Sequence, residues 1–535
     1  MANKNYDVVI IGAGAGGGVA AALLAEAGKK VLLLERGKAQ TFEETGRSHL
    51  HNQRVSANGH NAGPDARHPR VVVEGDGTER TVRPWEPGYQ ANAAVVGGGT
   101  RVYGGQAWRF HPLDFKMAST YGSPTGSSLA DWPISFDDLA PFYDKVEHEL
   151  GVSGDHTRMS HLPAYARPYP MRPLTDTKRS AVLRAGADAL GWQTFPVPLA
   201  VNSEPYLDRP ACTHCQHCVG FACPVDAKNG AQNTFIPRAI ASGNCELMTD
   251  VMVERILTRG ATATGVSYFT AQTKRERVDA DVVIVAGGAV ESARLLLHSG
   301  IGNDQVGRNL QGHVYVAAFG LMPEEVWDGI GPGPTTATAK WSHGNADVIG
   351  GGMLCDDFIT LPVAFWRSAR QPETPLWGAD CKNWMRDRYR RTLEIKGPIQ
   401  DTPSPDARVT MDPKLKDYWG IPVARLTGAT HPESMRTAKL LHGKAVEWLK
   451  ASGAVDVWGD APSTPFLSGG QHQAGTCRMG DDPASSAVDR NCCVHGMDNV
   501  YVADGSVHVT NGGFNPFLTI MANAYRTTQG IIARW

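Results

Sequence analysis

The first 35 residues carry apolar and glycine-rich stretches in an order that predicts a strand, a helix and a second strand. Residues 8–11 are an uncharged run of β-branched side chains, which is typical of a strand buried on both faces. Residues 19–24 predict a helix, and the apolar run at residues 31–34 predicts the second strand. This order is that of a βαβ unit, from which parallel sheets are built.

Three glycines join the first predicted strand to the helix with the spacing Gly-x-Gly-x-x-Gly, at Gly12, Gly14 and Gly17. The first allows a tight turn, the second lets the backbone approach a pyrophosphate, and the third lets helix and strand pack closely. Glu35 follows the second strand, about 20 residues on, where an acid binds ribose hydroxyls. In this setting the motif predicts dinucleotide binding.

After Glu35 the pattern becomes polar and irregular to about residue 85, and we expect this segment to run over the surface. Residues 95–110 then hold five glycines between apolar anchors. Such a loop lets the backbone approach a flat ligand closely, and a plain surface loop is the alternative. Ser135 or Asp137 is expected to cap a following helix.

The middle of the chain repeats the strand and helix pattern of the N-terminal residues. Residues 245–253 and 281–288 hold two further strand candidates, and the second leads into a helix expected at residues 290–298. This return predicts that the dinucleotide-binding domain is discontinuous in sequence.

Residues 313–455 alternate between polar and apolar runs, including residues 363–366 and 384–389, and predict an antiparallel sheet with long loops. Such a sheet would form the wall of a substrate pocket. A last helix is expected from about Leu518.

At 535 residues the chain is too long for one ordinary core, and two domains are expected. The predicted fold class is α/β, or α+β overall, with a Rossmann-like dinucleotide-binding domain and a second domain built on an antiparallel sheet. The first domain is predicted at residues 1–115, 211–312 and 456–535, and the second at residues 116–210 and 313–455.

The net charge is −2 with balanced acids and bases, so we expect no nucleic-acid partner and no anionic-membrane surface. No signal peptide or membrane span is recognised in the pattern. A cytoplasmic location is therefore expected, with export on a partner subunit's signal as the alternative.

Four of the ten cysteines lie within twelve residues, at Cys212, Cys215, Cys218 and Cys223. Their spacing differs from the bacterial ferredoxin run only in the last gap, which favours an iron–sulfur cluster or zinc. The alternative is a cysteine-rich turn with free thiols or a disulfide, and the spacing leaves the two open.

Several ordered motifs together resemble the glucose-methanol-choline (GMC) flavoprotein oxidoreductases along nearly the full length of the chain. The matching stretches are the N-terminal turn with Glu35 and residues 97–100, 131–133, 286–288 with Glu291, 307–313, 472–476 and 502–505. Residues 515–516 and 518–519 are similar to the pyranose oxidase and sugar 3-oxidase branch. Residues 108–110 and 114–115 and the cysteine stretch look like the catalytic subunits of bacterial flavin sugar dehydrogenases.

The resemblance implies bound FAD, with its ADP part on the N-terminal turn and its ring system against the glycine loop and the C-terminal motif. The implied cofactor-binding residues are Gly12, Gly14, Gly17, Glu35, Arg36, Gly98, Gly99, Thr100, Gly104, Gly105, Val251, Ala286, Asp504, Gly505, Asn515, Pro516 and Thr519. Some pyranose oxidases hold the flavin covalently through a histidine of the glycine loop. Residues 97–110 contain no histidine and Val102 occupies that place, so non-covalent FAD is expected.

Alcohol oxidation by a flavin needs a base for the hydroxyl proton while the carbon-bound hydrogen leaves as hydride. His472 matches the family's catalytic histidine, and imidazole is suited to accepting a proton near neutral pH. Asn515 matches the second catalytic position, where its amide can orient the substrate oxygen. His313 and His508 are interpreted as structural or supporting residues.

The resemblance therefore predicts oxidation of a secondary hydroxyl of a pyranose sugar or glycoside, at C-3 or C-2, with oxygen or a small acceptor reoxidising the flavin. Aromatic residues between Phe365 and Tyr389 could stack on the sugar, although most such residues are core. The main alternative is a sugar dehydrogenase that passes electrons through a cluster to a partner subunit. A lyase with a non-redox flavin is a third hypothesis, disfavoured by the His472 and Asn515 pair.

Overall fold

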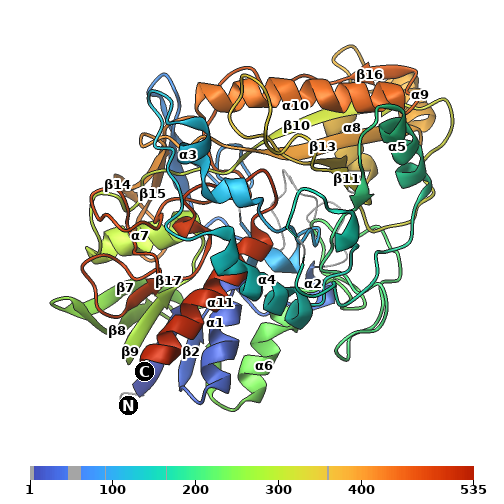
Figure 1. Ribbon diagram of the computed structural model, residues 1–535. Coiled ribbons are helices and arrows are strands. Elements are labelled where there is room, and N and C mark those ends of the chain that lie inside the picture. The colour runs from blue at the N-terminus through green and yellow to red at the C-terminus, as the bar shows by residue number, and fades with distance from the viewer. Residues whose placement is uncertain (1–4, 46–61, 91, 164, 358–360) are drawn as a thin grey trace.

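The computed structural model describes residues 5–45, 62–90, 92–163, 165–357 and 361–535. Three sheets organise this part of the chain, with the N-terminal strands at one end of the molecule and the longest helix, α10, at the other (Figure 1). No helix among these residues is long and apolar enough to cross a membrane.

A seven-stranded sheet forms the predicted Rossmann-like part and is mostly parallel. Its strand order is β6 (Cys245–Met248), β2 (Val31–Leu34), β1 (Asn5–Ile11), β9 (Arg275–Val285), β8 (Thr262–Phe269) and β7 (Met252–Arg259), with β17 (Val500–Val502) also beside β9. Strands β2, β1, β9, β17 and β6 pair in parallel, and β7 and β8 are antiparallel. The single strand candidate at residues 245–253 is thus two strands.

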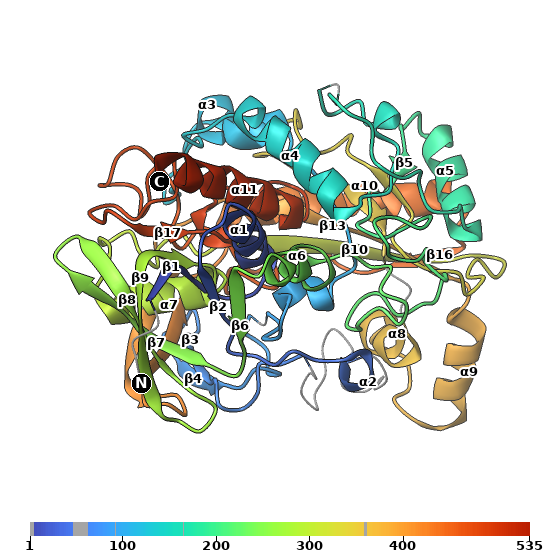
Figure 2. The same cartoon turned by 90° about the horizontal axis from the view of Figure 1, so that it is seen from below.

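Helices cover one face of this sheet. Figure 2 shows α1 (Ala15–Glu26) between α6 (Phe235–Ala241) and α11 (Phe517–Arg534). Helix α4 (Phe136–Leu150) packs on α11, and of the two expected caps, Ser135 and Asp137, it is the side chain of Ser135 that caps the helix. Glycine and alanine fill much of the buried face of α1, so the helices approach closely around it.

A six-stranded antiparallel sheet confirms the expected second sheet. Its order is β16 (Asp456–Trp458), β10 (His313–Leu321), β13 (Thr392–Gln400), β12 (Leu354–Asp356), β11 (Thr336–Thr338) and β5 (Phe195–Pro196). One face of β10 and β13 packs on α10 (Pro432–Ala451), which sequence reasoning did not anticipate, and α5 (Lys178–Ala189) lies against α10.

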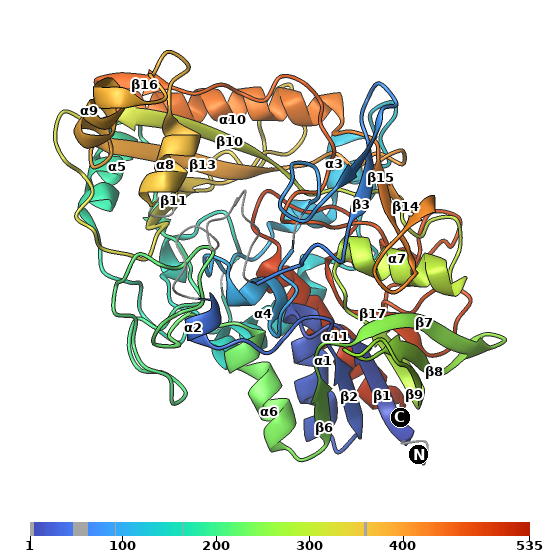
Figure 3. The same cartoon turned by 180° about the vertical axis from the view of Figure 1, so that it is seen from behind.

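The two aromatic runs expected within the sheet are instead helical, which corrects the prediction. Residues 363–366 lie in α8 (Pro362–Ala369) and residues 384–389 lie in and just after α9 (Gly378–Arg388), at the far end from β1 (Figure 3). Phe365 packs with Trp384 and Tyr389 in a small core against the sheet. This packing places them in core rather than in the large cavity described below.

A third sheet of four strands overturns the expectation that residues 36–85 only run over the surface. Its order is β14 (Arg408–Lys416), β15 (Pro422–Thr427), β3 (Arg70–Val73) and β4 (Glu79–Val82). Val72 and Val82 are buried together with Tyr89, and β3 pairs in parallel with β15, more than 340 residues later in the chain. Residues 46–61 of the same segment lie outside the described residues.

The remaining helices are α2 (Phe42–Thr45), α3 (Met117–Tyr121) and α7 (Ala289–Ser299), and α7 packs against β7, β14 and β15. The helices expected at residues 290–298 and from Leu518 are confirmed as α7 and α11. The domain boundaries stay a prediction. Two strands predicted in the first domain pair with strands predicted in the second: β3 pairs with β15, and β16 pairs with β10.

Candidate active site

A cavity of about 710 Å³ runs between the seven-stranded sheet, the four-stranded sheet and the C-terminal segment. One part of it is lined by the N-terminal turn and by Glu35. Another part is lined by the glycine loop and by His472 and Asn515. Residues from distant parts of the sequence therefore meet in one elongated space.

The N-terminal turn has the geometry that its glycines predict. Gly12 has a φ of +108°, and a Cβ there would lie 2.3 Å from the carbonyl oxygen of Ala286, so only glycine fits. A Cβ on Gly17 would lie 1.9 Å from the carbonyl oxygen of Gly12, which explains the close helix–strand packing. Gly14 caps the N-terminus of α1 at the cavity wall, and a Cβ added to it would meet no atom within 4 Å. The backbone thus leaves room for an anion at a helix N-terminus.

The carboxylate of Glu35 is buried at the end of β2 and fixed by the backbone. Its Oε2 accepts a hydrogen bond from the amide of Ala13 at 2.9 Å, and its Oε1 accepts one from Gly37 at 2.8 Å. Burial raises the pKa of Glu35, while these amides act in the opposite direction. The acid is therefore held rigidly beside the turn, where a ribose would lie.

Three arginines surround Glu291 at the wall of the same cavity. Arg70 Nη2 lies 2.7 Å from Glu291 Oε1, and the guanidinium groups of Arg294 and Arg36 lie 3.2 and 3.4 Å from Oε2. Burial alone would raise the pKa of Glu291, but the three cations hold it well below its usual range. Arg294 also pairs with the buried carboxylate of Asp417 at 2.7 Å. Glu35 lies near Arg36, so the acids and bases of this wall balance.

Most of the cofactor-binding residues that the sequence predicts line this cavity. Those found there are Gly12, Gly14, Glu35, Arg36, Gly98, Gly99, Thr100, Gly104, Val251, Ala286, Asp504, Gly505, Asn515 and Pro516. Gly17 instead packs against the backbone of Gly12, and Gly105 lies against the side chain of Val201. Thr519 lies away from the cavity because its hydroxyl pairs with that of Tyr143 on α4 at 2.7 Å.

His472 lies at the cavity wall with its two ring nitrogens in different surroundings. Its Nε2 lies 3.4 Å from the side-chain nitrogen of Asn515. Its Nδ1 lies 2.8 Å from Nδ1 of His313 and 3.1 Å from the hydroxyl of Tyr315. The two residues that the sequence predicts as catalytic are therefore neighbours, and the side-chain oxygen of Asn515 is buried with no protein partner among the described residues.

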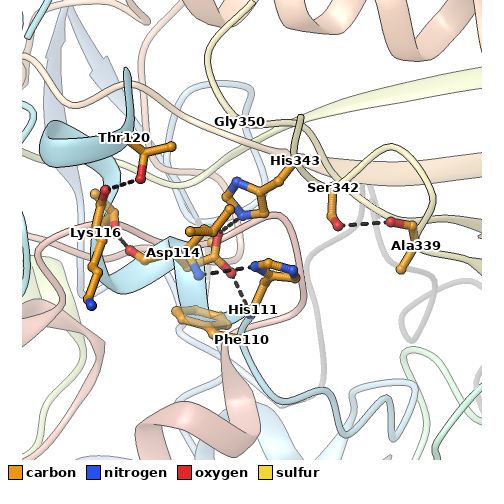
Figure 4. Close-up of polar contacts among 12 residues, drawn as sticks. Phe110, His111, Asp114, Lys116, Thr120, Ala339, Ser342, His343 and Gly350 are labelled. Carbon is orange, nitrogen blue, oxygen red and sulfur yellow. Dashed lines mark hydrogen bonds and ion pairs between the residues drawn. The ribbon is translucent and has the colours of Figure 1, made fainter. Parts of the chain in front are cut away.

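Asp114 supports the segment that carries Asn515 from the other side. Figure 4 shows its carboxylate between His111 and His343, with His343 Nε2 at 3.0 Å from Oδ1 and the amide of His111 donating to Oδ2. The carbonyl oxygen of Asp114 accepts a hydrogen bond from the hydroxyl of Thr510, and a Cβ on Gly512 would lie 3.1 Å from Oδ2. The buried pair thus packs behind residues 510–514 and fixes their path.

The cysteine stretch forms a loop beside the cavity. All four cysteines are unpaired thiols, and burial raises the pKa of Cys212 to about 11 and that of Cys218 to about 12. The ammonium of Lys228 is buried and donates to the carbonyl oxygens of Tyr103 and Phe221, both at 2.8 Å. In the described parts of the chain no three His, Cys, Asp or Glu side chains are grouped to hold a metal ion. The iron–sulfur hypothesis stays a prediction.

Several lining residues were missed by sequence reasoning. They include Arg70, Tyr89, Gln106, Val219, Gly220 and Arg294. Val219 and Gly220 lie inside the cysteine stretch, whose spacing directed attention to the thiols. Gln106 lies in the glycine loop, whose glycines directed attention away from its side chain. Arg70, Tyr89 and Arg294 stand in a strand, a loop and a helix with no local motif, so only their spatial position identifies them.

Comparison with known proteins agrees with this geometry. GMC oxidoreductase models match residues 72–315 and 403–524, and an FAD binding domain model matches residues 5–83. The 6'''-hydroxyparomomycin C oxidase of Streptomyces lividus is 30% identical over 99% of this chain and 92% of its own length. The fructose dehydrogenase large subunit of Gluconobacter japonicus is 26% identical over 99% of both chains.

Solved structures share the fold. The pyridoxine 4-oxidase from Mesorbium loti superposes with a TM-score of 0.63 at 18% identity, covering 98% of this chain and 99% of that one. The fold and the cavity thus define an FAD-dependent oxidoreductase that acts on CH–OH groups. The chain belongs to the GMC oxidoreductase family.

Proposed function

We propose that this enzyme oxidises a secondary hydroxyl of a pyranose sugar or glycoside, at C-3 or C-2, to the ketone. The observation that carries the proposal is the pairing of His472 Nε2 with Asn515 at the wall of the cofactor cavity. Bound FAD supplies the acceptor for the hydride that leaves the substrate carbon. Nε2 of His472 accepts the hydroxyl proton, and the amide of Asn515 orients the substrate oxygen.

The sheet face that contacts His472 through Tyr315 carries a further polar side chain, which supports a hydroxyl-rich substrate. Ala317 of β10 lies opposite Lys396 of β13, so Tyr315 and Lys396 project from the same face of the antiparallel ladder. The ammonium of Lys396 lies 5.8 Å from the ring centre of Tyr315. The other face of these strands packs on α10 through apolar side chains. The similarity to a protein named fructose dehydrogenase large subunit is in keeping with a sugar substrate.

The acceptor is proposed to be oxygen or a small molecule, and the location cytoplasmic. A second candidate is a dehydrogenase that passes electrons to a partner subunit. The observation that favours it is that Val219 and Gly220, within the cysteine stretch, line the cofactor cavity. A redox centre held by this loop would lie beside the flavin.

The experiment is an anaerobic test of flavin bleaching with D-glucose, methyl β-D-glucoside, D-fructose and paromamine, followed by product identification. Bleaching with a pyranoside and formation of a 3-keto or 2-keto product would support the proposal. An aldehyde at C-6 would contradict the regiochemistry, and bleaching by none of the four would contradict the substrate class. Reoxidation in air, compared with reoxidation by a quinone dye, distinguishes oxygen from a small-molecule acceptor.

A further inference from the structure

The contact between His313 and His472 determines which nitrogen of His472 holds a hydrogen. The rings cross at 86° with centroids 4.9 Å apart, and their Nδ1 atoms lie 2.8 Å from each other. At this distance one of the two nitrogens must donate a hydrogen and the other must accept it.

His313 can only accept at Nδ1. Its Nε2 lies 3.0 Å from the carbonyl oxygen of Asn511 and 3.0 Å from that of Gly512. Carbonyl oxygens accept and never donate, so Nε2 of His313 carries the hydrogen. Burial lowers the pKa of His313 to about 4, so the ring is neutral near pH 7 and holds one hydrogen only. Its Nδ1 therefore presents a lone pair.

His472 must then donate from Nδ1. The hydroxyl of Tyr315, 3.1 Å away, accepts as readily as it donates, so it does not oppose this arrangement. The opposite tautomer would place two lone pairs 2.8 Å apart at a partly buried site. With the hydrogen on Nδ1, Nε2 of neutral His472 bears the lone pair, and the amide group of Asn515 donates toward it.

We propose that His313 is a positioning residue that holds His472 in the Nδ1–H tautomer, which leaves on Nε2 the lone pair that accepts the proton of the substrate hydroxyl. The inference rests on the proposed role of His472 as the base. When His472 gains that proton it carries hydrogens on both nitrogens, and His313 still accepts from Nδ1 without rearrangement. The hydroxyl loses one proton and His472 gains it, so the step balances.

Three variants separate positioning from a general structural role. His313→Phe removes the acceptor and keeps the ring, whereas His313→Asn keeps an amide oxygen near the place of Nδ1. Tyr315→Phe is the matched control, because it removes the other contact to the same nitrogen. The first readout is the rate of anaerobic flavin reduction by methyl β-D-glucoside. The second is the tautomer of His472 in the holoenzyme, measured by ¹⁵N NMR of labelled histidine and assigned by signal loss in His472→Gln.

We expect His313→Phe to slow flavin reduction by about 10- to 100-fold, the range found when a partner that orients a metal-ligating histidine is lost. FAD content and the half-saturating sugar concentration should stay near those of the wild type, and the Nε2–H tautomer of His472 should appear. His313→Asn should recover much of the rate, and Tyr315→Phe should keep the Nδ1–H tautomer.

A wild-type His472 with its hydrogen on Nε2 would overturn the proposal, and this measurement needs neither a substrate nor a folded variant. An unchanged tautomer in His313→Phe would overturn it as well. Failure of the proposed function gives a different result: His472→Ala would then reduce its flavin at the wild-type rate, while the tautomer of the wild type remained Nδ1–H.

Discussion

At the scale of single residues, the proposed chemistry depends on His472 and Asn515. We expect His472→Ala to slow flavin reduction by roughly 10²- to 10⁴-fold, because a positioned base supplies about that factor. Asn515→Ala should slow the same step by less, since it orients the substrate oxygen but takes no proton. Stopped-flow reduction of the flavin under anaerobic conditions measures both effects.

The control for these variants is their FAD content, read from the flavin absorbance after purification. Both side chains lie at the cavity wall, so the cofactor should remain bound. A wild-type rate of reduction in His472→Ala with full FAD content would remove this histidine from the chemistry.

His161 gives a residue-scale prediction about stability. Its ring lies between Phe195 and Phe514, with centroids 5.3 and 5.5 Å away, and neither ring nitrogen has a hydrogen-bond partner in the described chain. Burial lowers its pKa to about 3, so below pH 6.5 the unfolded state binds a proton that the folded state does not. This side chain therefore costs stability increasingly as the pH falls from 6.5 toward 3.

We expect His161→Phe to raise the melting temperature, because it removes two buried polar atoms that lack partners. The gain should grow between pH 7 and pH 5, by up to about 1.4 kcal/mol per pH unit below 6.5. Thermal melts of the holoenzyme at both pH values provide the measurement. An equal gain at both would show that His161 is not held neutral by the fold.

At the scale of elements, the glycine loop at residues 97–110 predicts how FAD is held. The loop contains no histidine, and Val102 stands at the place of a covalent link in the family. FAD should therefore be released intact by acid or heat, and should appear in the supernatant after the protein precipitates. Flavin that stayed with the washed pellet would show a covalent bond and refute this prediction.

The cysteine loop distinguishes an oxidase from an electron-transfer dehydrogenase. A cluster needs several thiolates brought together, and no three His, Cys, Asp or Glu side chains of the described residues are grouped to hold a metal ion. We therefore expect less than one iron per chain in protein purified without oxygen. Three or four irons per chain, with broad absorption beneath the flavin bands, would contradict this expectation and favour the dehydrogenase.

At the scale of the whole molecule, the cofactor cavity lies between elements of two different sheets and the C-terminal segment. The cavity is lined by β1 and β2, by residues near β3 and β15, and by the C-terminal segment. Since FAD binds only the folded chain, its removal should lower the melting temperature, by the equivalent of about 2.7 kcal/mol when FAD had been present at 100 times its Kd.

Thermal melts of the apoenzyme, with and without added FAD, measure this effect. FAD should restore the holoenzyme melting temperature. Riboflavin at the same concentration should restore less, because it lacks the ADP part that the N-terminal turn and Glu35 are placed to bind. Equal melting of apoenzyme and holoenzyme would contradict the expected coupling.

Local pattern was sufficient wherever neighbouring residues decide the conformation. The strand–turn–helix–strand at residues 5–34, the cap of Ser135 and the helix α11 follow from short-range periodicity and capping, and the structure contains all of them. The cofactor turn was predictable for the same reason, because Gly12 and Gly17 are required by nearby backbone atoms of Ala286, which follows the paired strand β9, and of Gly12 itself.

The sequence pattern did not predict the structure correctly where contacts between distant residues determine the conformation. The aromatic runs around Phe365 and Trp384 form helices although their spacing also suits strands, since packing on one another selects the helical form. The segment that forms strand β3 was predicted to run over the surface, because its partner strand β15 lies far along the chain. Short apolar runs do not distinguish these outcomes by themselves.

The sequence alone thus determined the Rossmann-like start, the cofactor and the identity of His472 and Asn515 as candidates. Only the tertiary structure decided their surroundings: His313 lies 159 residues from His472, and Asp114 lies 229 residues from His343. No local rule specifies such pairs, because a hydrogen bond between distant residues depends on how sheets and loops pack. The direction in which His472 holds its hydrogen follows from that packing, and with it the nitrogen that can act as the base.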